Sequence, residues 1–364
     1  MQKRQSFIML TVVILSPFFV FAEDELKSYR DLEGDLERKK QPTEEEKRFL
    51  EASERFDPWY SGPLITGGPS NLAAGVYSIT PYEFLFTTNY ALWDENRRTQ
   101  NMTDRFVFSG STTFQAGITN WLDTTLILQG AANWQGNKSS GGFGDMTVGI
   151  GIQILSEGLY QPAIRFVFNE TFPTGKYQHL RGRLEGLDAT GLGSYQSQFG
   201  LRIGKLILWD TQHPIYLRGA YSISVLTDVH VKGFNSYGGG KKTNGTVRPG
   251  YAQQANAAIE WSLTQNWALA LDLVYNWSAR TTFKGFPGVS ETTFDNGGDP
   301  IDSIRFEGEA PSVGVGSNDQ FSLAPAIEFI PTASVNFLLG VWFNVYGRNV
   351  PQFVAVGTNM SYTF

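Results

Sequence analysis

Residues 351–364 end the chain and read PQFVAVGTNMSYTF. Side chains alternate between the two faces of an extended strand, so this stretch has two different sides. One side is apolar with an aromatic end and consists of Val354, Val356, Thr358, Met360, Tyr362 and Phe364. The other side is small and polar, as Ala355, Gly357 and Asn359 illustrate. The stretch therefore predicts a strand that lies between an apolar and a polar environment.

This predicted strand runs to the last residue of the chain, Phe364. An unpaired strand edge at a terminus promotes aggregation, whereas a closed membrane barrel pairs its last strand with its first. The ending resembles the C-terminal signature of bacterial outer-membrane barrel proteins, in which apolar residues at every second position precede an aromatic last residue. The resemblance implies that Met360, Tyr362 and Phe364 form the signal that the barrel assembly machinery reads after periplasmic chaperones deliver the chain.

The composition narrows the class of protein. Cys is absent, which excludes disulfides, thiolate metal sites and Cys nucleophiles. Aromatic residues make up 14% and charged residues only 18% of the chain, and Gly occurs 39 times. No apolar run of about 20 residues follows the N-terminus, so membrane strands fit this sequence better than membrane helices. The formal net charge of −6 offers no basic surface for nucleic acid.

The N-terminal residues predict a signal peptide over 1–22. Lys3 and Arg4 form a positive start, residues 7–21 are largely apolar, and Val20-Phe21-Ala22 fits a cleavage site. A signal peptide and a membrane barrel together predict export to the periplasm and insertion into the bacterial outer membrane, with outer-membrane lipid and lipopolysaccharide as partners.

Residues 23–57 are dense in Glu, Asp, Lys and Arg and predict a charged helical periplasmic extension. Thr43 and Glu46 have the spacing of a capping box at the start of its second helix. A helix that plugs the barrel and a helix that binds a partner are alternatives that the sequence leaves open. Residues 58–77 are predicted to be a linker, and residues 78–364 the barrel.

From residue 78 onward apolar and polar residues alternate in segments of about ten to fifteen residues. Met146, Val148 and Ile150, for example, alternate with Thr147 and Gly149. This pattern predicts an all-β fold, a transmembrane antiparallel β-barrel of about twelve strands. The predicted strands are 78–92, 105–118, 121–134, 143–155, 162–172, 194–207, 214–229, 250–263, 266–279, 319–330, 333–346 and 351–364.

The connections between these strands alternate in length. Short turns are predicted at 119–120, 156–161, 209–213, 264–265 and 331–332, and long loops at 93–104, 135–142, 173–193, 230–249 and 280–318. Bacterial barrels have short periplasmic turns and long outer loops, so both termini are expected on the periplasmic side. Four Trp fall at the short-turn ends and predict an aromatic girdle there: Trp121, Trp209, Trp261 and Trp267.

Charged residues occupy the polar faces of the predicted strands, mainly in the half near the short turns. A basic residue that faces lipid at midplane costs about 2–4 kcal/mol, so we expect these side chains to face the lumen. The pore-lining candidates form a positive and a negative arc, which are Arg165, Arg202 and Arg218, and then Glu260, Asp272, Glu328, Glu83 and Asp123.

Two arrangements of the arcs are open at this point. Arcs that stand apart create a transverse field at the constriction of an open pore, whereas arcs in direct contact fill a structural barrel. The predicted function is accordingly a porin-like channel that passes small-molecule solutes, and the alternative is a closed surface-exposed barrel that acts through its loops in adhesion or envelope organisation. Small inward residues such as Gly149, Gly200 and Ala268 favour the channel.

Three motifs in the middle of the barrel carry a second resemblance. They are Phe143-Gly144-Asp145, Pro162-Ala163-Ile164-Arg165 and Phe172-Pro173-Thr174-Gly175-Lys176. A Gly-Asp strand start followed by a strand that ends in Pro-Thr-Gly resembles the outer-membrane channel family associated with phenol meta-degradation pathways. This resemblance implies passage of small molecules, including aromatic or hydrophobic ones.

The sequence predicts no catalytic, cofactor-binding or metal site, and therefore no enzyme. Asp228 and His230 share a face, but no opposing carboxylate pair for water activation is evident. The loop at 237–243 departs from a phosphate-binding motif, and contact of its basic residues with lipopolysaccharide phosphates and simple solvation are both open. The Asp-rich residues 295–302 lack the ordered spacing of a calcium site.

Overall fold

The computed structural model describes residues 42–56, 60, 62–289 and 311–364. The chain divides into two compact units, Met1–Lys47 and Arg48–Phe364, and the second unit contains all the strands described. The predicted signal peptide and the Asp-rich stretch at 295–302 lie outside the described residues.

Helix α2 (Glu44–Phe56) is the second helix predicted in the extension. The Thr43 backbone N–H donates to Glu46 Oε2 at 2.7 Å, and the Glu46 N–H donates to Thr43 Oγ1 at 3.1 Å. These reciprocal bonds satisfy two backbone donors at the helix start, and the predicted capping box is confirmed. Among the described residues, no helix is both long enough and apolar enough to span a membrane.

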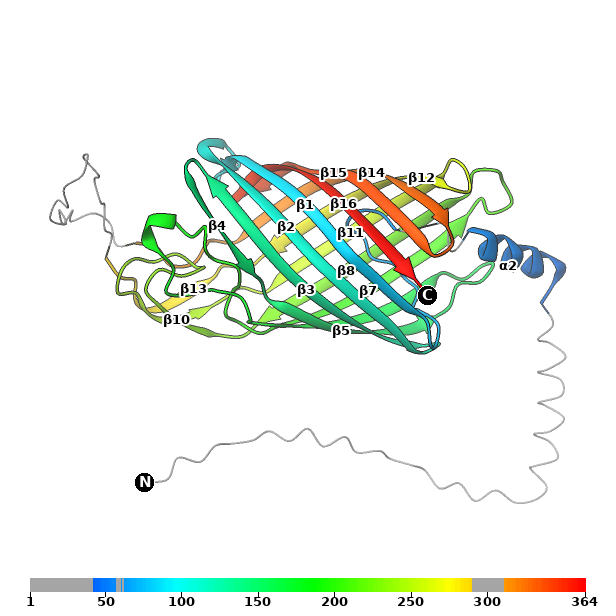
Figure 1. Ribbon diagram of the computed structural model, residues 1–364, viewed down its shortest axis with the longest axis horizontal. Coiled ribbons are helices and arrows are strands. Elements are labelled where there is room, and N and C mark those ends of the chain that lie inside the picture. Colours follow the sequence, from blue (N-terminus) through cyan, green and yellow to red (C-terminus); the bar gives the residue numbers. More distant parts are fainter. Residues whose placement is uncertain (1–41, 57–59, 61, 290–310) are drawn as a thin grey trace, which may run out of the picture. The chain divides into compact units, whose positions relative to one another are not determined.

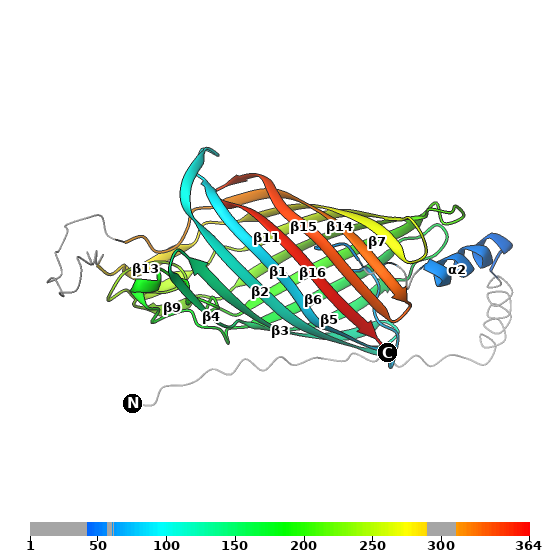
Figure 2. The ribbon, with the colours of Figure 1, turned by 45° about the horizontal axis from the view of Figure 1, so that its top comes forward.

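An antiparallel β-barrel follows, as predicted. In the part of the chain that the structure describes, thirteen strands form one sheet, in which β4 (Lys138–Phe143) pairs with β3 alone. Pairing of β2 with β3 closes the other twelve strands into a barrel, and they run tilted around it (Figures 1 and 2). The twelve are β1 (Tyr77–Trp93), β2 (Thr99–Thr119), β3 (Leu122–Gln135), β5 (Met146–Leu155), β6 (Ala163–Phe172), β7 (Gln196–Ile207), β8 (Ile215–Leu226), β11 (Ala252–Ser262), β12 (Trp267–Ser278), β14 (Asn318–Thr332), β15 (Val335–Arg348) and β16 (Val350–Thr363).

The last strand pairs with the first, as its sequence predicts. In the register of β1 and β16, Phe84 lies opposite Thr358 and Thr88 opposite Val354. Beyond the strand end, the backbones of Tyr77 and Phe364 exchange two hydrogen bonds of 2.9 Å. The pairing removes the terminal edge, and the C-terminus lies at the end of the barrel opposite β10 and β13 (Figure 1).

Inward and outward side chains alternate along the strands. In β12, Leu269 and Leu271 are 39% and 37% exposed, whereas Ala268 and Ala270 are buried. The outward faces of the other strands repeat this pattern with Leu, Val, Ile and Phe. A soluble protein rarely exposes so large an apolar surface, so the barrel is of the membrane-spanning kind.

The four Trp of the predicted girdle divide into two groups. Trp121, Trp261 and Trp267 are exposed on the barrel near the short turns. Trp209 instead packs edge-on against Phe49 of α2, with ring centroids 5.7 Å apart. The girdle is therefore smaller than predicted, because one ring covers an apolar residue that precedes the barrel.

The long-loop end differs from the sequence prediction in its strands. The connections expected at 93–104 and 135–142 shrink to 94–98 and 136–137, because β1, β2 and β4 extend into them. The ends of these strands were not predicted, because polar residues in contact with water show no alternation of apolar and polar positions. Three further short strands, β9 (Val229–Lys232), β10 (Asn244–Arg248) and β13 (Thr282–Phe286), form a separate sheet in the order β13-β10-β9.

Candidate functional site

A chain segment before β1 lies inside the barrel. We call residues 62–76 the lumen segment. The Ile65 and Thr66 backbone N–H groups donate to the two carboxylate oxygens of Asp272 on β12, at 3.1 and 3.0 Å. Asp272 is fully buried and shares the inward face of β12 with the buried Ala270. The Asp272 carboxylate thus accepts hydrogen bonds from two backbone N–H groups of the lumen segment.

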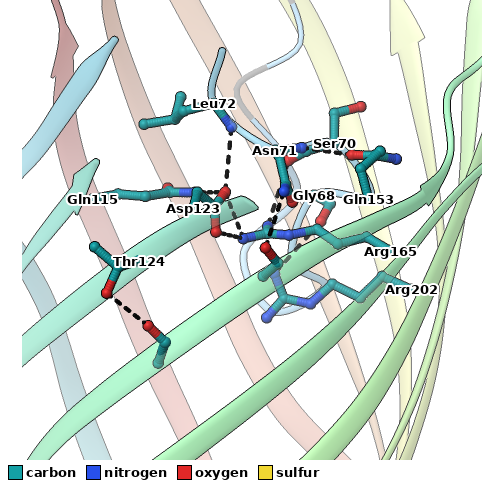
Figure 3. A network of polar contacts seen from close by, with 12 residues as sticks. Gly68, Ser70, Asn71, Leu72, Gln115, Asp123, Thr124, Gln153, Arg165 and Arg202 are labelled. Carbon is teal, nitrogen blue, oxygen red and sulfur yellow. Dashed lines mark hydrogen bonds and ion pairs between the residues drawn. The ribbon is translucent and has the colours of Figure 1, made fainter. Parts of the chain in front are cut away.

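The other end of the lumen segment contacts the opposite wall (Figure 3). The Asn71 backbone N–H donates to Gln153 Oε1 at 2.8 Å, and the Asn71 side-chain amide donates to the Gly151 carbonyl at 3.0 Å. The Leu72 N–H donates to Asp123 Oδ2 at 3.2 Å. Gln153 also donates to the Pro69 carbonyl at 3.0 Å. These polar contacts hold the segment across the lumen from β3 and β5 to β12.

Two glycine positions show how closely backbone and wall approach. A Cβ atom on Gly67 would lie 2.5 Å from the Arg202 guanidinium carbon, and one on Gly117 of β2 would lie 1.9 Å from the Ala73 carbonyl oxygen. Any larger residue there needs a shift of the segment or of the wall. Leu64 adds an apolar anchor, because it packs on Ala326 and Leu338.

Arg165 and Asp123 form a buried ion pair beside the segment (Figure 3). Arg165 Nη2 lies 2.6 Å from Asp123 Oδ1 and 2.8 Å from Oδ2, and the two side chains are 6% and 0% exposed. Arg165 Nη1 also donates to the Ser70 carbonyl at 3.4 Å. The pair therefore joins β6 to β3 across β5 and contacts the segment from both of its members.

Arg218 and Glu260 form a second buried pair. Arg218 donates through Nε to Glu260 Oε2 and through Nη2 to Oε1, the latter at 3.1 Å. Both side chains are almost inaccessible to solvent. Glu328, also fully buried, shares a side-chain hydrogen bond with Glu260. The positive and negative arcs predicted from the sequence are thus in direct contact at two places.

Arg202 differs from its two neighbours. Among the described residues it has no ion pair, and its Nη1 makes only a long 3.5 Å hydrogen bond to the Gly68 carbonyl. Its guanidinium lies against Gly67. We call Arg202 and the other residues of this layer the charged belt, which consists of Asp123, Arg165, Arg202, Arg218, Glu260, Asp272 and Glu328.

The remaining predicted site residues lie away from the charged belt. Glu83 accepts a hydrogen bond of 3.2 Å from Ser111 on the adjacent strand and is accessible to solvent. Phe364 stacks on Tyr77 and Tyr362, with ring centroids 5.9 and 5.5 Å apart. Met360 pairs in register with Tyr82. The pore-lining and assembly roles of these residues stay predictions.

A large cavity occupies the half of the barrel toward the long loops. Its volume is about 1930 Å³. Inward residues of β2, β3, β5, β6 and β7 form part of its wall, and Lys138 of β4 and Asp145 before β5 add to it. Loop residues 180–192 and 234–241 contribute the rest, together with Pro311. Amides and hydroxyls such as Gln129, Thr147 and Asn169 line its strand side. The lumen therefore has an open half and a half narrowed by the lumen segment.

The residues of the charged belt were predicted from the sequence, but the lumen segment was not, because residues 58–77 were predicted to be a linker. A signal was available, because residues 58–77 contain no Asp, Glu, Lys or Arg although the residues before them are densely charged. A solvent-exposed linker usually carries polar or charged residues. A segment inside a barrel is better without charged side chains of its own, because burying a charge is costly unless it is paired.

Asp228, which shares a strand face with His230 in the sequence, lies at the surface of the outer loops. Arg248 Nε lies 3.0 Å from Asp228 Oδ1, and this hydrogen bond holds the pKa of Asp228 below its usual value. Asp228 is thus the partner of a cation on the loop surface. Within the described ranges, no group of His, Asp and Glu has the arrangement of a metal site.

No family model and no curated protein matches this chain. Its fold is similar to that of the COG4313 outer membrane channel from Pseudomonas putida F1, with a TM-score of 0.61 and 12% identity over 82% of this chain and 98% of that chain. The β domain of the Bordetella autotransporter BrkA has a TM-score of 0.42, with 9% identity over 80% and 100% of the two chains. The TodX monoaromatic hydrocarbon channel deltaS2 mutant has a TM-score of 0.37, with 10% identity over 84% and 94%.

The fold similarity to the COG4313 channel extends over nearly the whole of that channel. The resemblance to outer-membrane channels that the sequence motifs predicted is confirmed at the level of the fold. The chain has the fold of an outer-membrane channel.

Proposed function

We propose that this protein is an outer-membrane channel for small molecules and that the lumen segment sets the width of its path. The observation that carries the proposal is the cavity of about 1930 Å³, whose wall includes inward-facing amides and hydroxyls of the barrel strands. A barrel of about eight strands is filled by its side chains, and one of sixteen leaves a wide channel. Twelve strands with an internal segment suit a narrow path.

The charged belt gives this path its electrostatic character. Asp123 and Glu260 are each neutralised by an Arg, whereas Arg202 keeps its charge beside the backbone of Gly67 and Gly68. A fixed charge next to a constriction selects among ions by their sign. We therefore expect the side of the belt formed by β7 and β8 to favour anions.

A selectivity measurement tests the channel proposal. Replacing Arg202 and Arg218 with Ala removes two positive charges from the belt, so the ratio of anion to cation permeability in planar-bilayer recordings should fall. Arg248→Ala removes an exposed charge at the outer loops and is the matched control, with the ratio unchanged. Equal ratios in all three proteins would contradict a role for the belt in conduction.

The resemblance to phenol-pathway channels adds aromatic and hydrophobic molecules to the proposed solutes. A closed barrel that acts through its loops in adhesion or envelope organisation is the second candidate, because the hydrogen bonds of Ile65, Thr66, Asn71 and Leu72 to the walls favour a lumen that stays filled. Conduction by the intact protein separates the two.

The barrel assembly machinery is proposed to recognise the end of the closing strand, β16 and Phe364. Deleting Phe364 removes the ring stack on Tyr77 and the two backbone bonds that end the β1–β16 pairing. We expect less protein to reach the heat-modifiable folded form in isolated outer membranes, as seen by gel mobility before and after boiling. Phe353→Leu keeps the end of the strand intact and should insert normally. Normal insertion of the deletion variant would remove Phe364 from the assembly signal.

Lipopolysaccharide is the proposed outer partner. Positive charge lies on the small outer sheet and its connection, next to the barrel end with the long loops. Its residues are Lys232 of β9, Lys241 and Lys242 between the strands, and Arg248 of β10. Phosphates of an anionic lipid surface attract such a cluster.

A further inference from the structure

Charged side chains of both signs line the cavity in the long-loop half. Among the described residues, the cations are Arg105, Lys138, Arg183 and Lys241, and the carboxylates are Asp145 and Glu185. Lys138 pairs with Glu185, and Arg183 and Lys241 are exposed to solvent, whereas Arg105 is partly buried. A partly buried charge without a counter-charge is costly unless a ligand or water compensates for it, which favours an anion beside Arg105.

Both carboxylates of the cavity are already engaged. The oxygens of Asp145 accept the backbone N–H groups of Gly175 and Leu192, at 2.8 and 2.9 Å. Glu185 Oε1 lies 2.5 Å from Lys138 Nζ. Neither group is therefore placed to neutralise Arg105.

Arg105 is the cation best fixed for binding. It lies on the inward face of β2, and its Nη2 donates to Asn133 Oδ1 at 3.1 Å. Asn133 is itself oriented by its donation to the Leu187 carbonyl at 3.0 Å. Arg105 Nε is buried and has no hydrogen-bond acceptor among the described residues. A guanidinium held on one side, with donors left over, is preorganised for a planar acceptor such as a carboxylate.

Apolar residues share the same cavity. Leu180 and Phe234 come from the two loops, and Ile127 comes from β3. We propose that the cavity binds a small organic anion, whose carboxylate contacts the Arg105 guanidinium and whose compact apolar or aromatic body lies against these side chains. The inference rests on the proposed channel function and names its solute class.

Benzoate and its neutral isostere benzamide are suitable probes. Calorimetric titration of the refolded full-length protein at low salt should show tighter binding of benzoate than of benzamide. Arg105→Gln should weaken benzoate binding by about tenfold or more, the loss expected for a hydrogen bond to a charged group, and leave benzamide binding unchanged. Arg105→Lys keeps the charge but not the planar guanidinium, so its affinity for benzoate should lie between those of the wild type and Arg105→Gln.

Arg248→Gln is the matched control, because it removes the same charge from β10 of the outer sheet, outside the cavity, and should leave benzoate binding unchanged. Equal affinities for benzoate and benzamide, or no binding of either probe, would overturn the inference, and this comparison needs no variant. If benzoate binding falls equally in Arg105→Gln and Arg248→Gln, the anion is attracted by the overall positive charge and not by Arg105. That result would also overturn the inference. Binding is measured without flux, so conduction by the same protein would still support the channel.

Discussion

Removal of residues 63–72 is expected to increase the flux of small neutral solutes through the barrel several-fold. These residues cross the lumen between Asp272 and Asp123, and they contribute none of the barrel strands. Without them the charged belt faces an aqueous bore, which in a twelve-stranded barrel is wide enough for water and small solutes. Swelling of proteoliposomes in arabinose, compared with the wild type, measures the change.

The matched control removes residues 42–57, which include α2 and leave the lumen segment in its place. Its swelling rate should equal that of the wild type. Both variants must show the mobility shift on boiling that marks a closed barrel. A deletion of 63–72 that folds but swells no faster would mean that the segment does not limit the path.

Replacing Arg165 with Met is expected to lower the free energy of unfolding by about 3 kcal/mol, because it leaves the Asp123 carboxylate buried without its counter-charge. Asp123 also accepts hydrogen bonds from Leu72 N–H and Gln115 Nε2, so it cannot turn away from the lumen without breaking them. Urea titration of the barrel in lipid vesicles measures the loss.

Two further proteins make this result specific. The double variant Arg165→Met with Asp123→Asn removes the stranded charge but keeps an acceptor for Leu72, and should recover much of the stability. Arg248→Met breaks an ion pair of the same type on the exposed loop surface and should have little effect. Equal stability of Arg165→Met and the wild type would show that the buried pair is not needed for the fold.

The strands were predictable because the membrane imposes their pattern. Each strand separates lipid from a polar lumen, so Leu269 and Leu271 alternate with Ala268 and Ala270 in the sequence itself. The charged belt was predictable for the same reason, since Arg165, Arg218 and Glu260 fall on the polar phase of their strands. Their direct pairing was left open, because single-strand patterns do not fix which lumen side chains meet.

The lumen segment was not predictable in the same way. Its contacts join backbone N–H groups to side chains far away in the chain, such as Ile65 to Asp272, and no periodicity records them. The small outer sheet was also missed. Val229, Val231 and Val247 form its core, but strands of four or five residues are too short for alternation to stand out.

Single-channel recording of the refolded wild-type protein in planar bilayers tests the central claim most directly. A channel narrowed by the lumen segment predicts discrete and small conductance steps, which become larger when residues 63–72 are removed. Absence of conductance at every voltage, in protein that shows the mobility shift of a closed barrel, would contradict the channel and leave the closed surface barrel.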